Sequence, residues 1–170
     1  YLEFKAQQHS LDGIEAVRRD QGVISEPGVT PERFTLARVT PGLFTLIRTP
    51  PVLGRGFSPD DGKAGAEPVV LLGSGIWKNR YASDPHVIGR AVHVNGTAAT
   101  IIGVMPDGFK FPNNEDFWMP LVSTPDLEKH TNHSLDLFAL RRPGVSLVAV
   151  NADLAVIAAR IAADHAETNA

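Results

Sequence analysis

Cysteine is absent from this sequence of 170 residues. Its absence excludes disulfide bonds, thiolate metal sites and iron–sulfur clusters, and it excludes nucleophilic catalysis by a thiol. A domain of this length can build a sufficient hydrophobic core without disulfides. The absence is therefore compatible with a location outside the cytoplasm.

Long apolar runs and dense positive charge are missing too. No run approaches the roughly 20 apolar residues that cross a membrane as a helix. The longest basic runs are the pairs Arg18–Arg19 and Arg141–Arg142, and the net charge is −3. Since nucleic-acid-binding proteins present a basic stripe to phosphates, nucleic acid is not an expected partner. The chain opens at Tyr1 without a signal peptide, and we expect both ends to be boundaries inside a longer protein.

Glycine-rich phosphate loops are the third absence. Neither GxxxxGK[ST] nor a GxGxxG motif after a predicted strand occurs in the sequence. The sequence therefore predicts no ATP site, and we expect no bound cofactor.

Short strands, hairpins and helices are predicted along most of the chain. Strands are expected at 14–24, 33–39, 68–72, 92–94, 100–104, 117–121 and 137–140, and helices at 1–8, 41–47, 75–81 and 147–161. The first and last thirds each supply a strand and a helix, and the middle third is a compact β-rich insert. This order predicts an α+β fold with two lobes, one of which contains both ends of the chain.

Local signals fix several of these boundaries. Asn95-Gly96 predicts a tight hairpin, because both central positions of a type I′ turn need positive φ. Thr40, Ser74 and Ser146 are expected to cap the helices that follow them. Pro120 predicts that the strand at 117–121 lies at a sheet edge, since proline cannot donate to a ladder.

Ser74 is the strongest candidate for a nucleophile. It lies between a predicted strand and a predicted helix in the sequence Leu72-Gly73-Ser74-Gly75-Ile76. The nucleophile elbow of hydrolases has glycines two residues before and after the serine, whereas these glycines are adjacent to it. We therefore favour a helix N-cap, and a serine hydrolase stays as an alternative.

His130 and His133 are the strongest candidates for metal ligands, because their spacing can place two imidazoles on one helical face. Carboxylates lie nearby at Asp126, Glu128 and Asp136. A zinc site needs three or four ligands in a defined frame, and the HExxH frame is missing. The sequence favours a polar connector here, with a metal hydrolase as the less favoured alternative, and no metal site is assigned.

Two exposed segments are the best candidates for contact with a partner. Paired carboxylates at Asp60-Asp61 and Glu115-Asp116 lie in turns, where such side chains bond the local backbone, and a catalytic pair is less favoured. Aromatic residues beside a Gly/Pro-rich loop form a partner surface when the loop cannot bury them. The predicted contact residues are Asp60, Asp61, Lys63, Phe109, Phe111, Asn113 and Asn114.

An ordered set of motifs resembles the extracytoplasmic core domain of MacB-like permeases of ABC transporters. The central stretch is Glu67–Pro106, which reads strand, helix, Asp-Pro turn, strand, Asn-Gly hairpin and strand. The other matching segments are Ala37–Phe44, Leu53–Phe57, Phe117–Leu121 and Arg142–Ser146. The resemblance covers nearly the whole chain from Val39 onward, and the ordered set is more specific than any one motif.

The resemblance implies a porter-like lobe formed by 1–66 and 131–170 and a β-rich, sabre-like insert formed by 67–130. The first porter strand and both flanking membrane helices of the family are not in this sequence, so the porter-like lobe is expected to be incomplete. It also implies a location on the extracytoplasmic face of the inner membrane, as part of an integral membrane protein.

The function that the resemblance implies is mechanical and not chemical. The domain would couple ATP-driven movement to export or to force on a periplasmic partner, and it would not be an enzyme. The implied partners are a second permease protomer, a cytoplasmic ATPase and a MacA-like adaptor protein, and the fragment alone would be a monomer or a weak oligomer. The alternative from a different class is a periplasmic module that binds a small molecule or a peptide between its lobes.

Overall fold

The structure is a computed structural model that describes residues 2–122, 124 and 134–164. Its helices are α1 (Leu2–Gln7), α2 (Leu43–Leu46), α3 (Ser74–Tyr81) and α5 (Leu147–Asp164), with short 3-10 helices at Pro59–Gly62 and Pro85–Val87. Its strands are β1 (Leu11–Glu26), β2 (Val29–Val39), β3 (Leu53–Gly54), β4 (Val69–Leu72), β5 (Ala91–Val94), β6 (Thr97–Val104), β7 (Phe117–Pro120) and β8 (Asp136–Arg141). The predicted α+β class is confirmed.

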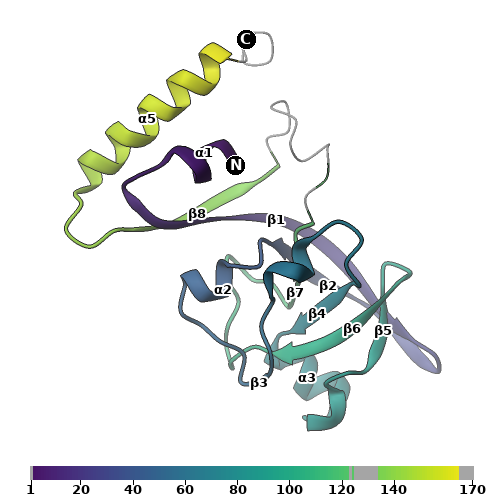
Figure 1. Ribbon diagram of the computed structural model, residues 1–170. Helices are drawn as coiled ribbons and strands as arrows, with labels where there is room; N and C mark the ends of the chain where they lie inside the picture. Colours follow the sequence, from purple (N-terminus) through teal and green to yellow (C-terminus); the bar gives the residue numbers. More distant parts are fainter. Residues whose placement is uncertain (1, 123, 125–133, 165–170) are drawn as a thin grey trace.

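Six strands pair in a closed circuit and form a small barrel, in the lower half of Figure 1. β1 pairs with β2, β2 with β7, β7 with β4, β4 with β6, β6 with β5, and β5 again with β1. The β2–β7 and β4–β6 pairs are parallel and the others are antiparallel. Outside this circuit, β3 pairs with β6 and β8 pairs with β1.

Alternate residues of the barrel strands contribute to two different cores, as the two-residue period of a strand requires. The first core fills the barrel, and residues of α3 and the following turn close it; it includes Ile24, Leu36, Val70, Leu72, Ile76, Tyr81, Val87, Val92, Ile101 and Phe117. The second core lies between the barrel wall and α2; it includes Val39, Leu43, Phe44, Leu71, Met105 and Trp118. The barrel wall is therefore buried on both faces where α2 covers it.

The long strand β1 continues beyond the barrel into a second group of elements. There Leu11–Val17 pairs with β8, and α1 and α5 contribute residues that pack on β1 (Figure 1). Val150 of α5 is buried against Leu11 and Ile14 of β1, with Leu154 half-buried beside them. We call α1, Leu11–Val17, β8 and α5 the end unit. Within the described part of the chain, no helix has the length and apolarity that a membrane span requires.

The end unit and the barrel do not coincide with the predicted lobes. β2 of segment 1–66 pairs with β7 of segment 67–130, and β1 pairs with β5. One sheet therefore contains strands from both sides of the predicted boundary at 66 and 67, and the division into two lobes stays a prediction.

Two of the three predicted helix caps are wrong. The residue before α2 is Gly42, and Thr40 instead accepts a hydrogen bond from the Ala16 backbone N–H at 2.9 Å. The residue before α3 is Gly73, and Ser74 is the first helical residue. The third prediction is confirmed, because Ser146 accepts a hydrogen bond from the Ala149 N–H at 3.1 Å. A cap depends on which of several neighbouring residues begins the helix, and sequence signals place that point only to within one or two residues.

The prediction that Pro120 marks an edge strand is also wrong. β7 lies between β2 and β4, but β4 pairs only as far as Trp118. The N–H of the next residue, Leu121, donates to Val39 of β2 at 2.7 Å. Because successive N–H groups of a strand point in opposite directions, the nitrogen of Pro120 faces the β4 side, where the pairing between β7 and β4 has already stopped, and no ladder bond is lost.

The hairpin at Asn95-Gly96 is confirmed, with φ of 51° and 82° at the two positions. The structure adds a second role for Asn95. Its side-chain oxygen accepts from the Val23 N–H at 2.8 Å, and its amide donates to the Gln21 carbonyl at 3.2 Å. The turn residue that sequence favours for its backbone conformation thus also fastens the β5–β6 hairpin to β1.

Candidate functional site

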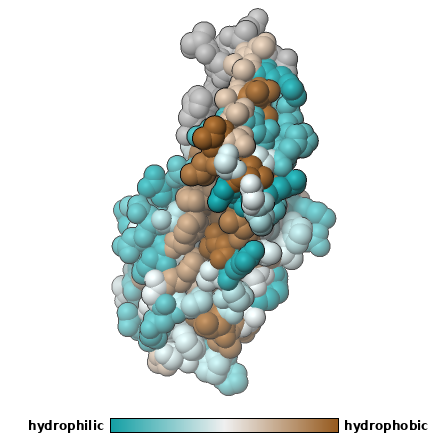
Figure 2. Space-filling view, turned by 90° about the vertical axis from the view of Figure 1, so that its left-hand side faces the viewer, coloured by the Kyte–Doolittle hydropathy of each residue, from teal (hydrophilic) through white to brown (hydrophobic). Residues whose placement is uncertain are grey.

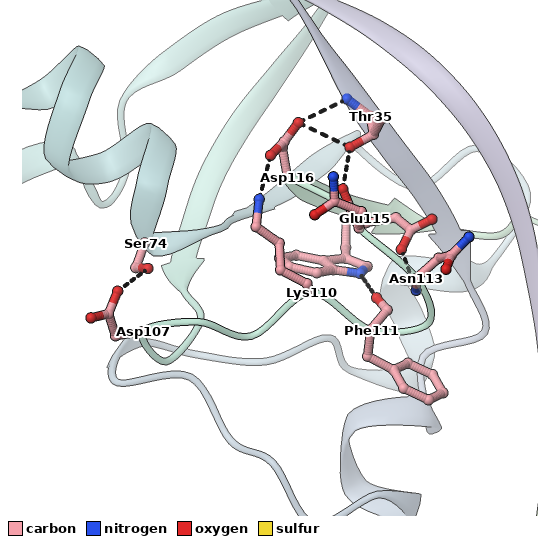
Figure 3. A network of polar contacts seen from close by, with 10 residues as sticks. Thr35, Ser74, Asp107, Lys110, Phe111, Asn113, Glu115 and Asp116 are labelled. Carbon is pink, nitrogen blue, oxygen red and sulfur yellow. Dashed lines mark hydrogen bonds and ion pairs between the residues drawn. The ribbon is translucent and has the colours of Figure 1, made fainter.

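The predicted contact residues Phe109, Phe111, Asn113 and Asn114 lie in the loop between β6 and β7. Asp116 fastens this loop to β2, because its carboxylate accepts from the backbone N–H of Thr35 at 3.1 Å and from the Thr35 hydroxyl at 2.9 Å (Figure 3). The ammonium of Lys110 donates to the other carboxylate oxygen at 2.6 Å. Burial opposes the charged form of Asp116, but these bonds from Lys110 and Thr35 hold its pKa below the ordinary value.

Two further bonds fix the tip of the loop. The indole N–H of the buried Trp118 donates to the Phe111 carbonyl at 2.8 Å, and the Asn113 N–H donates to the Glu115 carboxylate at 2.7 Å (Figure 3). Glu115 is itself buried. Asn113 and Asn114 are exposed at this tip, so the loop presents two amide side chains on a backbone that is fixed from several sides.

The two phenylalanines of the loop are half-buried and belong to a row of aromatic rings. Ring centroids are 5.9 Å apart for Phe44 and Phe109, 6.4 Å for Phe109 and Phe111, and 4.7 Å for Phe111 and Phe138. Spacings of this order are typical of favourable aromatic pairs. The aromatic part of the predicted surface is therefore largely engaged inside the molecule.

The second predicted segment, from Asp60 to Lys63, is a turn closed by Asp61. The Asp61 carboxylate accepts two bonds from the Arg55 guanidinium, at 2.7 and 3.0 Å, and one from the Ser58 N–H at 2.6 Å. The bonds from Arg55 are the main reason that the pKa of Asp61 lies below its ordinary value, and those from Ser58 add to them, against burial. Asp60 and Lys63 form an exposed ion pair at 2.6 Å. Asp61 therefore holds the turn, whereas Asp60 and Lys63 face solvent.

Phe44 of α2 brings the two segments into one region. Phe57, which precedes the turn, has its ring centroid 5.7 Å from that of Phe44, and Phe109 contacts Phe44 from the other segment. A shallow depression of about 540 Å³ lies beside the turn, lined mainly by Arg55, Asp60, Asp61, Lys63, Glu67 and Val69. Arg55 pairs with Asp61 and Lys63 pairs with Asp60 in this depression, and its charged lining makes it a poor match for the apolar pocket that a small-molecule module would need.

Ser74, the candidate nucleophile, donates its hydroxyl to Asp107 at 2.8 Å (Figure 3). Lys78, one turn further along α3, forms an ion pair with the same carboxylate oxygen at 2.8 Å. Lys78 first, and then Ser74, hold the pKa of Asp107 below its ordinary value. A carboxylate whose pKa is lowered is a weak general base, so this pair is poorly suited to activating a serine.

The candidate metal ligands His130 and His133 lie outside the described residues. Among the residues that the structure does describe, no group of three or more His, Asp or Glu side chains could hold a metal ion.

A buried charge cluster that the sequence did not reveal joins the end of β1 to α3. The Glu26 side chain, 3% exposed, accepts from the Tyr81 hydroxyl at 2.8 Å. The guanidinium nitrogens Nε of Arg80 and Arg90 lie 3.4 and 2.6 Å from its two carboxylate oxygens. Arg80 also pairs with Glu32 of β2 at 2.7 Å. The Glu26 carboxylate of β1 thus joins two residues of α3 and Arg90, the residue before β5. No local motif could have indicated this cluster, because the partners of Glu26 are 54 to 64 positions away.

Tyr81 should make the stability of the domain depend on pH above 10. Burial, and then the bond to Glu26, raise the pKa of Tyr81 to about 12. Between pH 10 and 12 the unfolded chain has lost the phenolic proton and the folded chain keeps it, so stability falls as the pH rises, by up to about 2 to 3 kcal/mol. We expect Tyr81→Phe to be less stable than the unsubstituted protein at pH 7 and the difference to shrink by pH 12, as measured by urea unfolding. A constant difference across this range would contradict the assignment.

Comparison with known proteins identifies the family and structures with the same fold. The chain matches the family model of the MacB-like periplasmic core domain over residues 2–157. No match was found among curated proteins. The structure resembles the periplasmic region of MacB from Actinobacillus actinomycetemcomitans, with a TM-score of 0.70 and 17% identity over 96% of this chain and 72% of that chain.

Two further solved structures have the same fold. The extracellular domain of the ABC-type transporter YknZ from Gram-positive bacteria gives a TM-score of 0.70 at 13% identity, over 97% of this chain and 83% of that one. A domain of a proposed permease protein from Porphyromonas gingivalis gives a TM-score of 0.72 at 14% identity. The match covers 94% of this chain and 68% of that one. At these identities the likeness shows the fold, while the family model, which spans most of the chain, shows the family. This chain therefore belongs to the MacB-like periplasmic core domains, a family of periplasmic domains of ABC transporter permeases.

Proposed function

We propose that this domain couples ATP-driven movement of a parent permease to export or to force on a periplasmic partner, without chemistry of its own. The parent would be anchored in the inner membrane, with this domain on its extracytoplasmic face, and a cytoplasmic ATPase would supply the energy. Its partners would be a second permease protomer and a MacA-like adaptor protein. Membership of the family supports this role.

The fastened loop between β6 and β7 is the observation that carries the proposal. Asp116, Glu115 and Trp118 hold its backbone, while Asn113 and Asn114 face solvent (Figure 3). A surface that is already ordered loses little conformational entropy on binding, so it can form a contact at low cost. We assign the direct contacts to the two asparagines and to the exposed pair Asp60 and Lys63, and a supporting role to Asp61, Phe109 and Phe111.

The polar groups around α3 support a function without catalysis. Ser74 lies beside an acidic residue that is itself bonded to Lys78, and both carboxylate oxygens of the buried Glu26 are paired with arginine side chains. If a hydrolase were the correct function, Ser74→Ala would abolish it. We expect this variant to leave the activity of the parent transporter unchanged.

Cysteine cross-linking can test the contact directly, because this domain contains no cysteine of its own. In the parent permease with its other cysteines removed, Asn114→Cys should form a cross-link to the adaptor or to the second protomer, and its yield should change when ATP is bound. Asn79→Cys is the matched control, since Asn79 is an exposed asparagine on α3, outside both predicted contact segments. Equal yields at the two positions, or no cross-link from Asn114→Cys in any nucleotide state, would overturn the proposed contact.

A further inference from the structure

The end unit and the barrel are joined by one continuous strand. β1 pairs with β8 over Leu11–Val17 and with β2 over Val17–Glu26. Val17 is the one residue of β1 that pairs both with a strand of the end unit and with a strand of the barrel. It lies opposite Asp136 of β8 and Val39 of β2. Next to Val17, the Thr40 N–H donates to the Ala16 carbonyl and the Ala16 N–H donates to the Thr40 hydroxyl, both at 2.9 Å. Further towards Leu11, the described contacts of the end unit with the barrel side are made by side chains, so β1 near Val17 is a natural pivot.

An aromatic contact bridges the two parts beside this pivot. Phe111 belongs to the barrel side, where Trp118 bonds its carbonyl, and its ring lies 4.7 Å from that of Phe138 in an edge-to-face arrangement at 65°. Phe138 belongs to β8, opposite Glu15 of β1. Both rings are half-buried at the margin of the second core, so water can replace the contact without reaching the core inside the barrel.

The same junction contains a group that opposes the closed arrangement. Glu15 is 7% exposed, and its carboxylate oxygen Oε1 accepts from Lys5 at 3.0 Å. Its other oxygen, Oε2, is buried without a hydrogen-bond partner. The residue before α2, Gly42, lies so close to the Glu15 carboxylate that a Cβ added at Gly42 would be 2.5 Å from Oε1. A buried unsatisfied carboxylate oxygen is unfavourable, and water would satisfy it if the end unit moved away from α2.

We infer that the contact between Phe111 and Phe138 is a latch that holds the end unit in one orientation on the barrel, and that its release lets the end unit pivot about β1 near Val17. The aromatic contact favours the latched arrangement and the unsatisfied Glu15 opposes it. Two arrangements of similar free energy are what a domain needs if a modest force is to move it from one to the other. This inference deepens the proposed coupling function and rests on it for its biological meaning.

Part of the exposed apolar surface lies on the end unit. Figure 2 shows apolar side chains running along one face, from the upper part of the molecule into its lower body. The exposed apolar residues of the end unit include Leu137, Leu140, Leu147, Val148 and Val156. A pivot of the end unit would change the continuity of this strip without uncovering the core inside the barrel.

Spin-label distance measurements on this cysteine-free chain test the latch. We would label A159C on α5 and A98C on β6, both exposed positions, and measure the distance distribution in the unsubstituted chain and in the Phe138→Ala and Phe111→Ala variants. We expect each variant to raise the fraction of a second distance by roughly fivefold, the factor that corresponds to the loss of one aromatic contact. Adding Glu15→Gln to Phe138→Ala should lower that fraction again, because a neutral amide costs less to bury than a carboxylate.

Three controls separate a latch from general loosening. Phe34→Ala removes a half-buried ring that packs only on the barrel core, and it should leave the distance between the two labels unchanged. A second pair, A98C with A64C, lies within the barrel and should be constant in every variant. Phe138→Leu keeps an apolar side chain and is used if the alanine variant does not fold.

An unchanged distance distribution in folded Phe111 and Phe138 variants would overturn the latch. So would an equal change with Phe34→Ala. This measurement needs neither the transporter nor a partner. Failure of the latch would therefore be distinct from failure of the proposed contact at Asn114, which cross-linking in the parent reports.

Discussion

Replacing Glu26 with alanine is expected to lower the free energy of unfolding by about 3 to 5 kcal/mol, as measured by urea denaturation. The carboxylate is 3% exposed and is the common partner of Arg80, Arg90 and Tyr81. Arg80 is equally buried, and without Glu26 its remaining charged partner is Glu32, which is half exposed. The variant therefore leaves the buried guanidinium of Arg80 with only a half-exposed carboxylate as its partner. An unpaired buried charge destabilises a protein by more than an intact buried ion pair stabilises it.

The chemistry of the cluster provides its own controls. Glu26→Leu combined with Arg80→Met removes both charges and should be much more stable than the sum of the two single changes predicts. Asp60→Ala removes a carboxylate from an exposed ion pair and should leave the unfolding midpoint unchanged, because solvent-exposed pairs contribute little. If Glu26→Ala were as mild as Asp60→Ala, the buried cluster could not be what fastens β1 to α3.

Gly54→Ala is expected to destabilise the domain by about 2 to 5 kcal/mol. Gly54 has φ of +74°, a conformation that residues with a Cβ rarely adopt. A Cβ at this position would also lie 2.2 Å from the Ile102 carbonyl oxygen, which accepts the backbone hydrogen bond from Arg55. The obstacle is backbone and cannot rotate away, so β3 would have to separate from β6.

Gly65→Ala is the matched control for this change. Gly65 has φ of +81°, but a Cβ there would meet nothing within 4 Å. Its substitution should therefore cost only the backbone strain, about 1 to 2 kcal/mol. The difference between the two variants isolates the clash with β6. Equal urea midpoints for Gly54→Ala and Gly65→Ala would show that the close approach of β3 and β6 contributes nothing to stability.

Much of the fold could be predicted because its signals are local. Asn95-Gly96 forms the predicted hairpin, Ser146 caps the predicted last helix, and alternation of apolar residues marks the strand that contains Leu36. The turns at Asp60-Asp61 and Glu115-Asp116 also behave as their residue types suggest, since Asp61 and Glu115 accept bonds from nearby backbone N–H groups. Each of these features depends on residues within a few positions of one another.

The errors share the opposite property. Ser74 was expected to cap a helix, but Asp107, 33 positions away, is its partner. Pro120 was expected at an edge, but its missing N–H has no cost because the pairing between β4 and β7 stops at Trp118. Phe109 and Phe111 do not belong to these errors: they are predicted to contact a partner, and the structure adds that both pack into the aromatic row, with Phe111 against Phe138. Their part in partner contact stays a prediction.

The sequence by itself determined the class of the fold, most of its elements and the family resemblance, because propensity, periodicity and turn chemistry are encoded over short windows. Only the tertiary structure decided that β1 serves both the barrel and the end unit, and that Glu26 meets Arg80 and Arg90. It also decided that one oxygen of Glu15 is buried without a partner. The physical reason is that these contacts join residues far apart in the chain, whose partners depend on how the barrel closes. Hydrogen-bond satisfaction and ion pairing are properties of that closed arrangement and not of any segment.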